Sequence, residues 1–116
     1  MKKESIYIPK LKREIDFYIG MNAQDNFDII DQSEPEDLWF HVEGQASCHI
    51  VASLSKEEID RKEKGYIIRQ GAELCKRFSK QKSQKNLAIV YTRIKFVTKT
   101  NIIGQVEVEN TSLITI

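Results

Sequence analysis

The sequence predicts an α+β domain in which one long central helix packs on one face of a mostly antiparallel or mixed β-sheet. Segments with polar–apolar alternation, which is typical of half-buried strands, lie on both sides of a central region. That central region begins with a helix N-terminal motif, S-x-x-E, and carries apolar residues at helical spacing. The 116 residues fit a single domain, spanning 1–116, that can bury a core without disulfides or metals.

The N-terminal part begins with a charged stretch. Residues 1–13 are expected to form a loose segment or a short edge strand. The alternating segment EIDFYIG, 14–20, predicts a strand that ends at a glycine. Two interpretations of 23–30 stay open, because Asn22 can cap a short helix there while FDII is equally compatible with a strand. Residues 32–37, which contain a proline, are expected to form a loop.

Two short strands follow. The segments DLWFHV, 37–42, and CHIVASL, 48–54, predict a hairpin across the turn EGQAS. Strand alternation gives them a core-facing apolar set, which consists of Leu38, Phe40, Val42, Ile50, Ala52 and Leu54. The only tryptophan, Trp39, and both histidines, His41 and His49, are therefore expected to point together to the opposite face.

A long helix is predicted from Ser55 to about Lys82. Ser55 and Glu58 match a capping box, and several cations near the far end suit the negative end of the helix dipole. Gly65 indicates a weak point near the start of the helix. The run NLAIVYTRIKFV, 86–97, is then expected to form the longest strand, and the segments IGQVEV and SLITI to close the chain as a hairpin.

Composition excludes several classes of protein. The chain is 41% hydrophobic and 30% charged, which is typical of a globular domain and not of a disordered one. No apolar run is long enough for a membrane span, and the first residues lead into no signal-peptide core. Cys48 and Cys75 fit no metal spacing and are too few for a disulfide framework, so we expect reduced thiols and a cytoplasmic setting.

The basic residues are unevenly distributed. Between Leu74 and Val106 the chain has eight Lys or Arg residues and no Asp or Glu, which leaves ten basic and seventeen acidic residues elsewhere. Such asymmetry indicates a polyanionic partner, although a solvated helix end followed by an ordinary sheet edge would produce it too.

Aromatic and basic residues would share one surface if 86–97 joins the sheet. Alternation then puts Tyr91, Arg93 and Lys95 beside the ring residues of the hairpin. Because rings stack on bases and cations neutralise phosphates, the pattern predicts a nucleic-acid-binding surface. The alternative is that Trp39 is a partly buried core residue and that the histidines form local hydrogen bonds.

No pattern in the sequence points to catalysis. It has no nucleophile elbow, no Gly-rich phosphate loop and no H-E-x-x-H motif, so the chain is not expected to be an enzyme. Cys48 and His49 are neighbours on a strand and point to opposite faces, so they form no dyad. Asp37, His41 and His49 could converge as a carboxylate and two imidazoles on a metal. Opposed histidines on paired strands are common without metal, and we expect neither a metal nor a cofactor.

An ordered series of short blocks resembles the NFACT-R domain family. The blocks are IGMNAQDN, DLWFHV, SCHIV, FSKQKS, VYT, KFVTK, GQVEV and LITI. They cover about residues 14–116, and DLWFHV is the most specific of them. Met21 stands where the family usually has an arginine, which removes a cation that could touch a phosphate. Ala46, Ser47 and Cys48 replace the usual Pro-Gly-Ser and alter a turn.

The resemblance implies a non-enzymatic module that binds structured RNA, such as tRNA or ribosomal RNA. In large NFACT proteins this domain accompanies further domains and acts in ribosome-associated quality control, so the large ribosomal subunit is an implied partner. Some small members carry the domain almost alone, and we expect this chain to be such a stand-alone form; one group of small members is linked to DNA sensing at membranes. DNA is therefore a further candidate partner, and an adaptor that docks proteins through the same face is the alternative function. The oligomeric state stays open.

The implied site combines motif positions with nearby cations. The motif positions are Asn22, Asp37, Trp39, His41, His49, Ser79, Lys80, Tyr91 and Lys99. Three further cations, Lys82, Arg93 and Lys95, are expected to contact phosphates. We therefore expect the indole, both imidazoles and a band of cations to lie side by side on one solvent-exposed face of the sheet.

Overall fold

The computed structural model describes residues 1–54 and 59–116. Its strands and helices alternate along the chain. They are β1 (Lys2–Ile8), β2 (Arg13–Ile19), α1 (Ala23–Asp31), β3 (Leu38–Val42), β4 (Ile50–Ser53), α2 (Arg61–Arg77), β5 (Ala88–Arg93), the 3-10 helix η1 (Ile94–Phe96), β6 (Val97–Lys99), β7 (Val106–Val108) and β8 (Ser112–Thr115). No helix in these residues is both long and apolar enough to cross a membrane.

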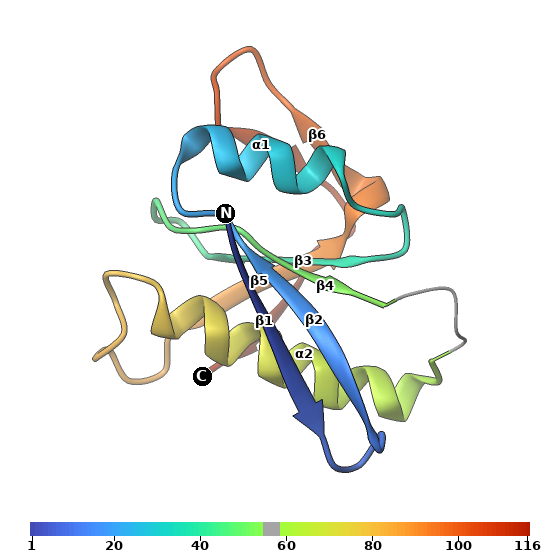
Figure 1. The fold of residues 1–116 in the computed structure, drawn as a ribbon. Coiled ribbons are helices and arrows are strands. Elements are labelled where there is room, and N and C mark those ends of the chain that lie inside the picture. Colours follow the sequence, from blue (N-terminus) through green and yellow to red (C-terminus); the bar gives the residue numbers. More distant parts are fainter. Residues whose placement is uncertain (55–58) are drawn as a thin grey trace.

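The architecture is α+β, as predicted, but it has three layers instead of two. A six-stranded antiparallel sheet has the order β1-β2-β4-β3-β5-β8, and β6 and β7 form a separate two-stranded sheet. Helix α2 lies on one side of the large sheet, and α1 lies with β6 on the other (Figure 1). The expectation of one long central helix covering a single face is therefore wrong, because α1 and the β6–β7 hairpin cover the second face.

The first core lies between the sheet and α2. It contains the apolar set predicted for β3 and β4, together with Ile67, Ala72 and Cys75 from the helix. Helix and sheet meet most closely at Gly71, where a Cβ atom would lie only 2.4 Å from the ring of Phe40. Glycine therefore lets α2 pack against the middle of β3 at a distance that no other residue allows without a shift.

The second core lies on the other face, and it contains Trp39. Ile29 of α1, Val51 of β4 and Ile94 of η1 are buried with it, and valines of β6 and β7 pack against them. The alternation predicted for β3 is thus confirmed, but both faces of the strand are buried. When both faces of a strand are buried, both sets of alternate residues can be apolar. The alternation then does not show which face, if any, is exposed to solvent.

Both ends of α2 differ from the prediction. Asp60 caps the helix in a capping box with Glu63, and the helix ends at Arg77 instead of about Lys82. The box expected from Ser55 and Glu58 lies outside the described residues. The end has a local cause, because the Ser79 hydroxyl donates to the carbonyl oxygen of residue 76 and accepts from the amide of residue 81.

The C-terminal strands also differ from the prediction. The strand expected over 86–97 ends at Arg93. The last two segments do not pair with each other, because β7 pairs with β6 and β8 pairs with β5. The hydroxyl of Thr92 donates to two carbonyl oxygens of the β7–β8 connection, at residues 109 and 110. This contact anchors the connection, which carries the chain from the small sheet back to the edge of the large one.

Candidate nucleic-acid interface

A cleft of about 1010 Å³ opens on the side of the sheet that α1 covers. Most of its lining comes from four segments: residues 20–26 at the start of α1, residues 39–49 of β3 and the following loop, residues 78–80 after α2, and residues 102–108 of the β6–β7 hairpin. The cleft is therefore built from parts of the chain that are far apart in sequence and that meet only in the folded domain.

Three aromatic side chains, Trp39, His41 and His49, form one wall of this cleft, and we call them the ring cluster. The rings of Trp39 and His41 are parallel within 5°, with centroids 5.6 Å apart. The His49 ring meets both edge-on, at 5.3 Å from Trp39 and 5.1 Å from His41. The predicted association of these three residues is confirmed.

The predicted exposure of the ring cluster is wrong. Trp39 is 2% exposed and His49 is 3% exposed, whereas His41 is half-buried. The indole Nε1 of Trp39 donates to Nδ1 of His49 at 3.1 Å, so the polar atom of the indole is paired inside the protein. Trp39 is thus a core residue behind the cleft wall, and His41 is the most accessible of the three rings.

Both histidines are neutral near neutral pH. Burial lowers the pKa of His49 to about 3, and the nearby His41 adds to this effect because two positive rings would repel each other. Burial also lowers the pKa of His41, although its hydrogen bond to the carbonyl of Val42 acts in the opposite direction. The ring cluster therefore offers uncharged imidazoles and not cations.

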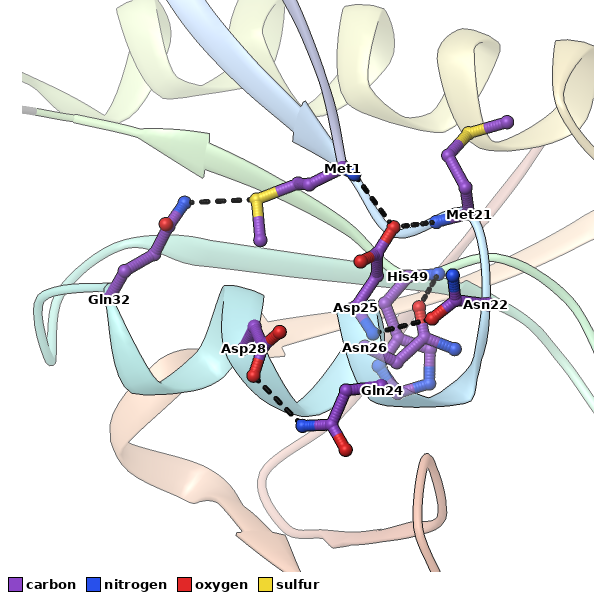
Figure 2. Close-up of polar contacts among 9 residues, drawn as sticks. All are labelled: Met1, Met21, Asn22, Gln24, Asp25, Asn26, Asp28, Gln32 and His49. Atoms are coloured by element: carbon purple, nitrogen blue, oxygen red, sulfur yellow. Dashed lines mark hydrogen bonds and ion pairs between the residues drawn. The ribbon is translucent and has the colours of Figure 1, made fainter.

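The start of α1 is fixed to the ring cluster by amide side chains. The side-chain oxygen of Asn22 accepts from the backbone amide of Asp25 at 2.8 Å (Figure 2), so of the two interpretations left open for 23–30 the capped helix is the correct one. The buried Asn26 accepts from the backbone amide of His49 at 3.3 Å (Figure 2). The exposed Met21 precedes them and donates its backbone amide to the carboxylate of Asp25.

The β6–β7 hairpin contributes residues to the cleft lining next to the start of α1. Its turn contains Gly104 at a φ of +84°, a left-handed conformation that favours glycine. A Cβ atom there would lie 2.8 Å from the Cβ of Ala23, so the turn rests directly on the first residue of α1. Ile102 and Ile103 in the same turn are large apolar side chains that remain exposed, at 60% and 58%.

Six of the twelve residues predicted for the site line this cleft. They are Asn22, Trp39, His41, His49, Ser79 and Lys80. Asp37 does not: its carboxylate is buried and accepts from the amides of Glu34 at 2.8 Å and Leu54 at 3.0 Å. Asp37 thus connects the loop before β3 to the end of β4. It does not converge with the histidines, and the described residues hold no group of three His, Cys, Asp or Glu side chains suited to a metal.

The residues predicted from β5 do not join the ring cluster. Tyr91 pairs with Phe40 and Arg93 pairs with Leu38, so both point to the α2 face, whereas Val90 pairs with His41. Lys95 lies in η1, beyond the end of the strand. The expected parity of 86–97 is wrong, because every second residue from Leu87 to Tyr91 packs in the first core instead.

The cations divide into paired and unpaired groups. Arg93 and Lys95 both form ion pairs with Glu36, at 3.0 and 2.6 Å, and Lys99 forms one with Asp31. Whether these three residues also contact nucleic acid stays a prediction. In contrast, the segment 79–86 carries Lys80, Lys82 and Lys85, which are exposed and have no ion pair within the part of the chain that the structure describes. We call this segment the lysine loop, and Lys80 places it at the edge of the cleft.

Sequence reasoning missed several residues of the cleft. Four residues that line the cleft are absent from the predicted site: Asn26, Phe78, Ile102 and Ile103. The predicted site also lacks Lys85, which belongs to the lysine loop but does not line the cleft. One signal was available in the printed sequence: NIIG puts two adjacent isoleucines before a glycine, and a turn that retains large apolar residues often marks a contact surface.

Comparison with known proteins gives the family. Residues 7–110 match the family described as the NFACT protein RNA binding domain. The chain is 32% identical over 88 residues to the coiled-coil domain-containing protein 25 homolog of Dictyostelium discoideum, and 33% identical over 84 residues to coiled-coil domain-containing protein 25 of Mus musculus. The matches cover 75% and 72% of this chain but only 43% and 40% of those relatives.

A solved structure supports the fold. The C-terminal part of the fibronectin/fibrinogen-binding protein from Streptococcus suis superimposes with a TM-score of 0.80 at 19% identity, over 100% of this chain and 45% of that one. This likeness concerns the fold alone. The match of the family over nearly the whole chain carries the assignment, and it agrees with the blocks around IGMNAQDN and DLWFHV. The chain belongs to the NFACT-R family of RNA-binding domains.

Proposed function

We propose that this chain is a non-enzymatic module that binds structured RNA, either tRNA or the ribosomal RNA of the large subunit, across the cleft and the lysine loop. Its membership of an RNA-binding family supports this function. The structural observation that carries it is the position of the lysine loop, whose three cations have no ion pair among the described residues and whose Lys80 lines a cleft that contains six of the predicted site residues.

Electrostatics favours the lysine loop over the other cations. A cation that already has a carboxylate partner must give up that partner, or share it, to neutralise a phosphate. Arg93 and Lys95 share Glu36, and Lys99 has Asp31, so all three start from this disadvantage. Lys80, Lys82 and Lys85 have no such partner among the described residues and release only counterions and water when they meet a phosphate.

Two variants with the same change in net charge test the proposal. The first carries Lys80→Ala, Lys82→Ala and Lys85→Ala, and the second carries Arg93→Ala, Lys95→Ala and Lys99→Ala. Binding of each to fluorescently labelled tRNA is followed by anisotropy over a series of salt concentrations. Each lost phosphate contact lowers the slope of log affinity against log salt by about one unit. We expect a loss of about three units for the first variant and of less than about one for the second.

Each outcome has a definite meaning. No binding of tRNA or of large-subunit RNA by the unmodified chain at low salt would refute the proposed function. Equal losses in the two variants would instead show that the ion-paired cations reach phosphates as well, as the sequence predicted. A DNA duplex of matched length is the competitor that decides between RNA and DNA, because only RNA presents the 2′-hydroxyl group.

A protein partner on the same cleft is the second candidate function. The observation that favours it is the exposed apolar side chains of Met21, Ile102 and Ile103 at the edge of the cleft. An association with the large ribosomal subunit that persists after nuclease digestion of the accessible RNA, and that Ile103→Ser weakens, would support this alternative over RNA binding.

A further inference from the structure

The interior of the cleft is almost free of charge. Of its lining residues only Glu43 and Lys80 carry a formal charge, and both histidines are neutral because burial lowers each pKa. Phosphate groups are bound most strongly by cations or by several converging N–H groups. The interior instead combines apolar walls with a few polar groups, which is the usual character of a site for a flat organic ligand.

The two imidazoles present one donor and one acceptor. Because Nδ1 of His49 accepts the indole proton of Trp39, the neutral His49 ring carries its own proton on Nε2. Nδ1 of His41 must donate to the carbonyl oxygen of Val42, 2.6 Å away, which leaves Nε2 of His41 as an acceptor. Neither Nε2 atom has a hydrogen-bond partner among residues 1–54 and 59–116. Because the two rings are perpendicular, at 84°, a flat ligand that lies parallel to His41 can present an acceptor on its edge to Nε2–H of His49.

The ring of His41 also continues an aromatic stack. It lies parallel to the buried indole of Trp39, and it is the half-buried member of the pair. A flat ligand on His41 would therefore have two layers of rings behind it. The cleft volume of about 1010 Å³ is at the upper end of the range for small-molecule sites, so it has room for a base with its sugar.

The mouth of the cleft supplies apolar cover. Met21, just before α1, and Ile102 and Ile103, in the β6–β7 turn, line the cleft and are all more than half exposed. Exposed side chains of this size are costly in water unless a ligand removes them from it. A planar ring that entered the cleft would cover part of this apolar surface.

We propose that the cleft binds an unpaired nucleobase of the RNA, stacked on His41 and hydrogen-bonded through an acceptor on its edge to Nε2–H of His49. This inference rests on the proposed RNA-binding function and deepens it. The phosphates next to this base lie on the lysine loop, because Lys80 belongs both to the loop and to the edge of the cleft. A base within a duplex is stacked and paired, so only a single-stranded end, loop or bulge supplies the ligand.

Three RNAs test this proposal with the unmodified chain. The first is a blunt RNA duplex, the second is the same duplex with an unpaired overhang at its 3′ end, and the third carries an overhang of equal length made of abasic nucleotides. We expect the natural overhang to bind at least about tenfold more tightly than the abasic one, since each stacked base contributes substantially to affinity. The abasic overhang keeps the phosphates, so the comparison isolates the base.

The variants locate the effect in the cleft. His41→Ala removes the stacking ring and Ile103→Ser removes the apolar cover, and each is expected to lose most of the gain from the bases. Leu113→Ser is the matched control. Leu113 is an exposed apolar side chain of the same size as Ile103, but it lies on β8, outside the cleft. The fluorescence of Trp39 shows whether each variant is folded. If His41→Ala does not fold, Ile103→Ser carries the test.

The outcomes separate this proposal from the one on which it depends. Equal affinity for the natural and abasic overhangs, with salt-dependent binding to all three RNAs, would overturn the base pocket and leave RNA binding intact. Full retention of the gain in both folded variants would overturn it too. Failure of all three RNAs to bind would overturn the proposed function itself, and the pocket with it.

Discussion

Acid should destabilise this domain well above the pH at which carboxylates titrate, and His49 is the reason. Its pKa is about 3 in the folded protein and about 6.5 when the chain is unfolded. The folded state therefore binds fewer protons than the unfolded state between these two values. The contribution of His49 to stability is complete above about pH 6.5 and is lost progressively as the pH falls towards about 3.

The size of the effect follows from proton linkage. Each unit of pH below the unfolded pKa of 6.5 costs about 1.4 kcal/mol of unfolding free energy. A change from about pH 7 to about pH 5 therefore removes about 2 kcal/mol through His49 alone. His41, whose pKa is also lowered by burial, acts in the same direction. A loss of this size is a large fraction of the stability of a typical small domain.

Urea denaturation followed by the fluorescence of Trp39 measures this loss. The tryptophan is the only one in the chain and lies in the second core, so it reports global unfolding. His49→Gln keeps an acceptor for the indole N–H but has no titrating group at this position. Between about pH 7 and about pH 5, the unfolding free energy of this variant should therefore fall by about 2 kcal/mol less than that of the unmodified protein. His41→Gln removes the other histidine and should retain the effect of His49. The reasoning is refuted if His49→Gln loses as much stability in acid as the unmodified chain.

Two further predictions concern the core and the edge of the cleft. Gly71→Ala should destabilise the domain by about 1–3 kcal/mol, because the new Cβ meets the Phe40 ring at 2.4 Å. Gly65→Ala in the same helix meets nothing within 4 Å and should stabilise it by about 0.5–1 kcal/mol; urea denaturation of both checks the contrast. Met21→Arg adds a cation at the exposed edge of the cleft, so it should tighten tRNA binding and steepen its salt dependence by about one unit. Unchanged salt dependence would mean that no phosphate lies there.

Strand alternation predicted the middle of the sheet correctly. The apolar set of β3 and β4 lies in the first core, and Trp39, His41 and His49 point together to the other face. These strands are short and their two faces differ in chemistry, so the period-two pattern is informative. The helix cap at Asn22 was also predicted, although the sequence alone left a strand open as an alternative.

The same reasoning failed for β5 and η1, where the two faces do not differ in chemistry. From Leu87 to Ile94, β5 and η1 present apolar residues in both parities, so the pattern does not say which set faces α2. In the folded protein, the pairing of β5 with β3 decides which set faces α2, because it puts Tyr91 opposite Phe40. The wrong parity predicted Tyr91 and Arg93 beside the ring cluster, whereas both point to the α2 face, and a one-residue error of this kind always transfers a whole set of side chains.

The cover of the second face was not predictable from local patterns. Trp39 is sealed by α1 and by a hairpin about 60 residues further along the chain, and no short window of sequence contains both. The same limit explains the ion pairs of Arg93 and Lys95, because their partner Glu36 lies in a distant loop. Formal charge counted along the chain therefore overestimated how many cations are free.

In the part of the chain that the structure describes, the β6–β7 hairpin shares no strand pairing with the large sheet, and this gives the cleft walls of unequal stiffness. The wall that carries the ring cluster belongs to a continuous ladder of backbone hydrogen bonds, so its displacement would break several of them at once. The part of the lining that carries Ile102 and Ile103 is attached by valine side chains, by the ion pair of Lys99 with Asp31 and by the contact of Gly104 with Ala23. Small movements of this part break only local contacts. The cleft opening can therefore adapt to ligands of different shape while the wall that carries the ring cluster stays in place.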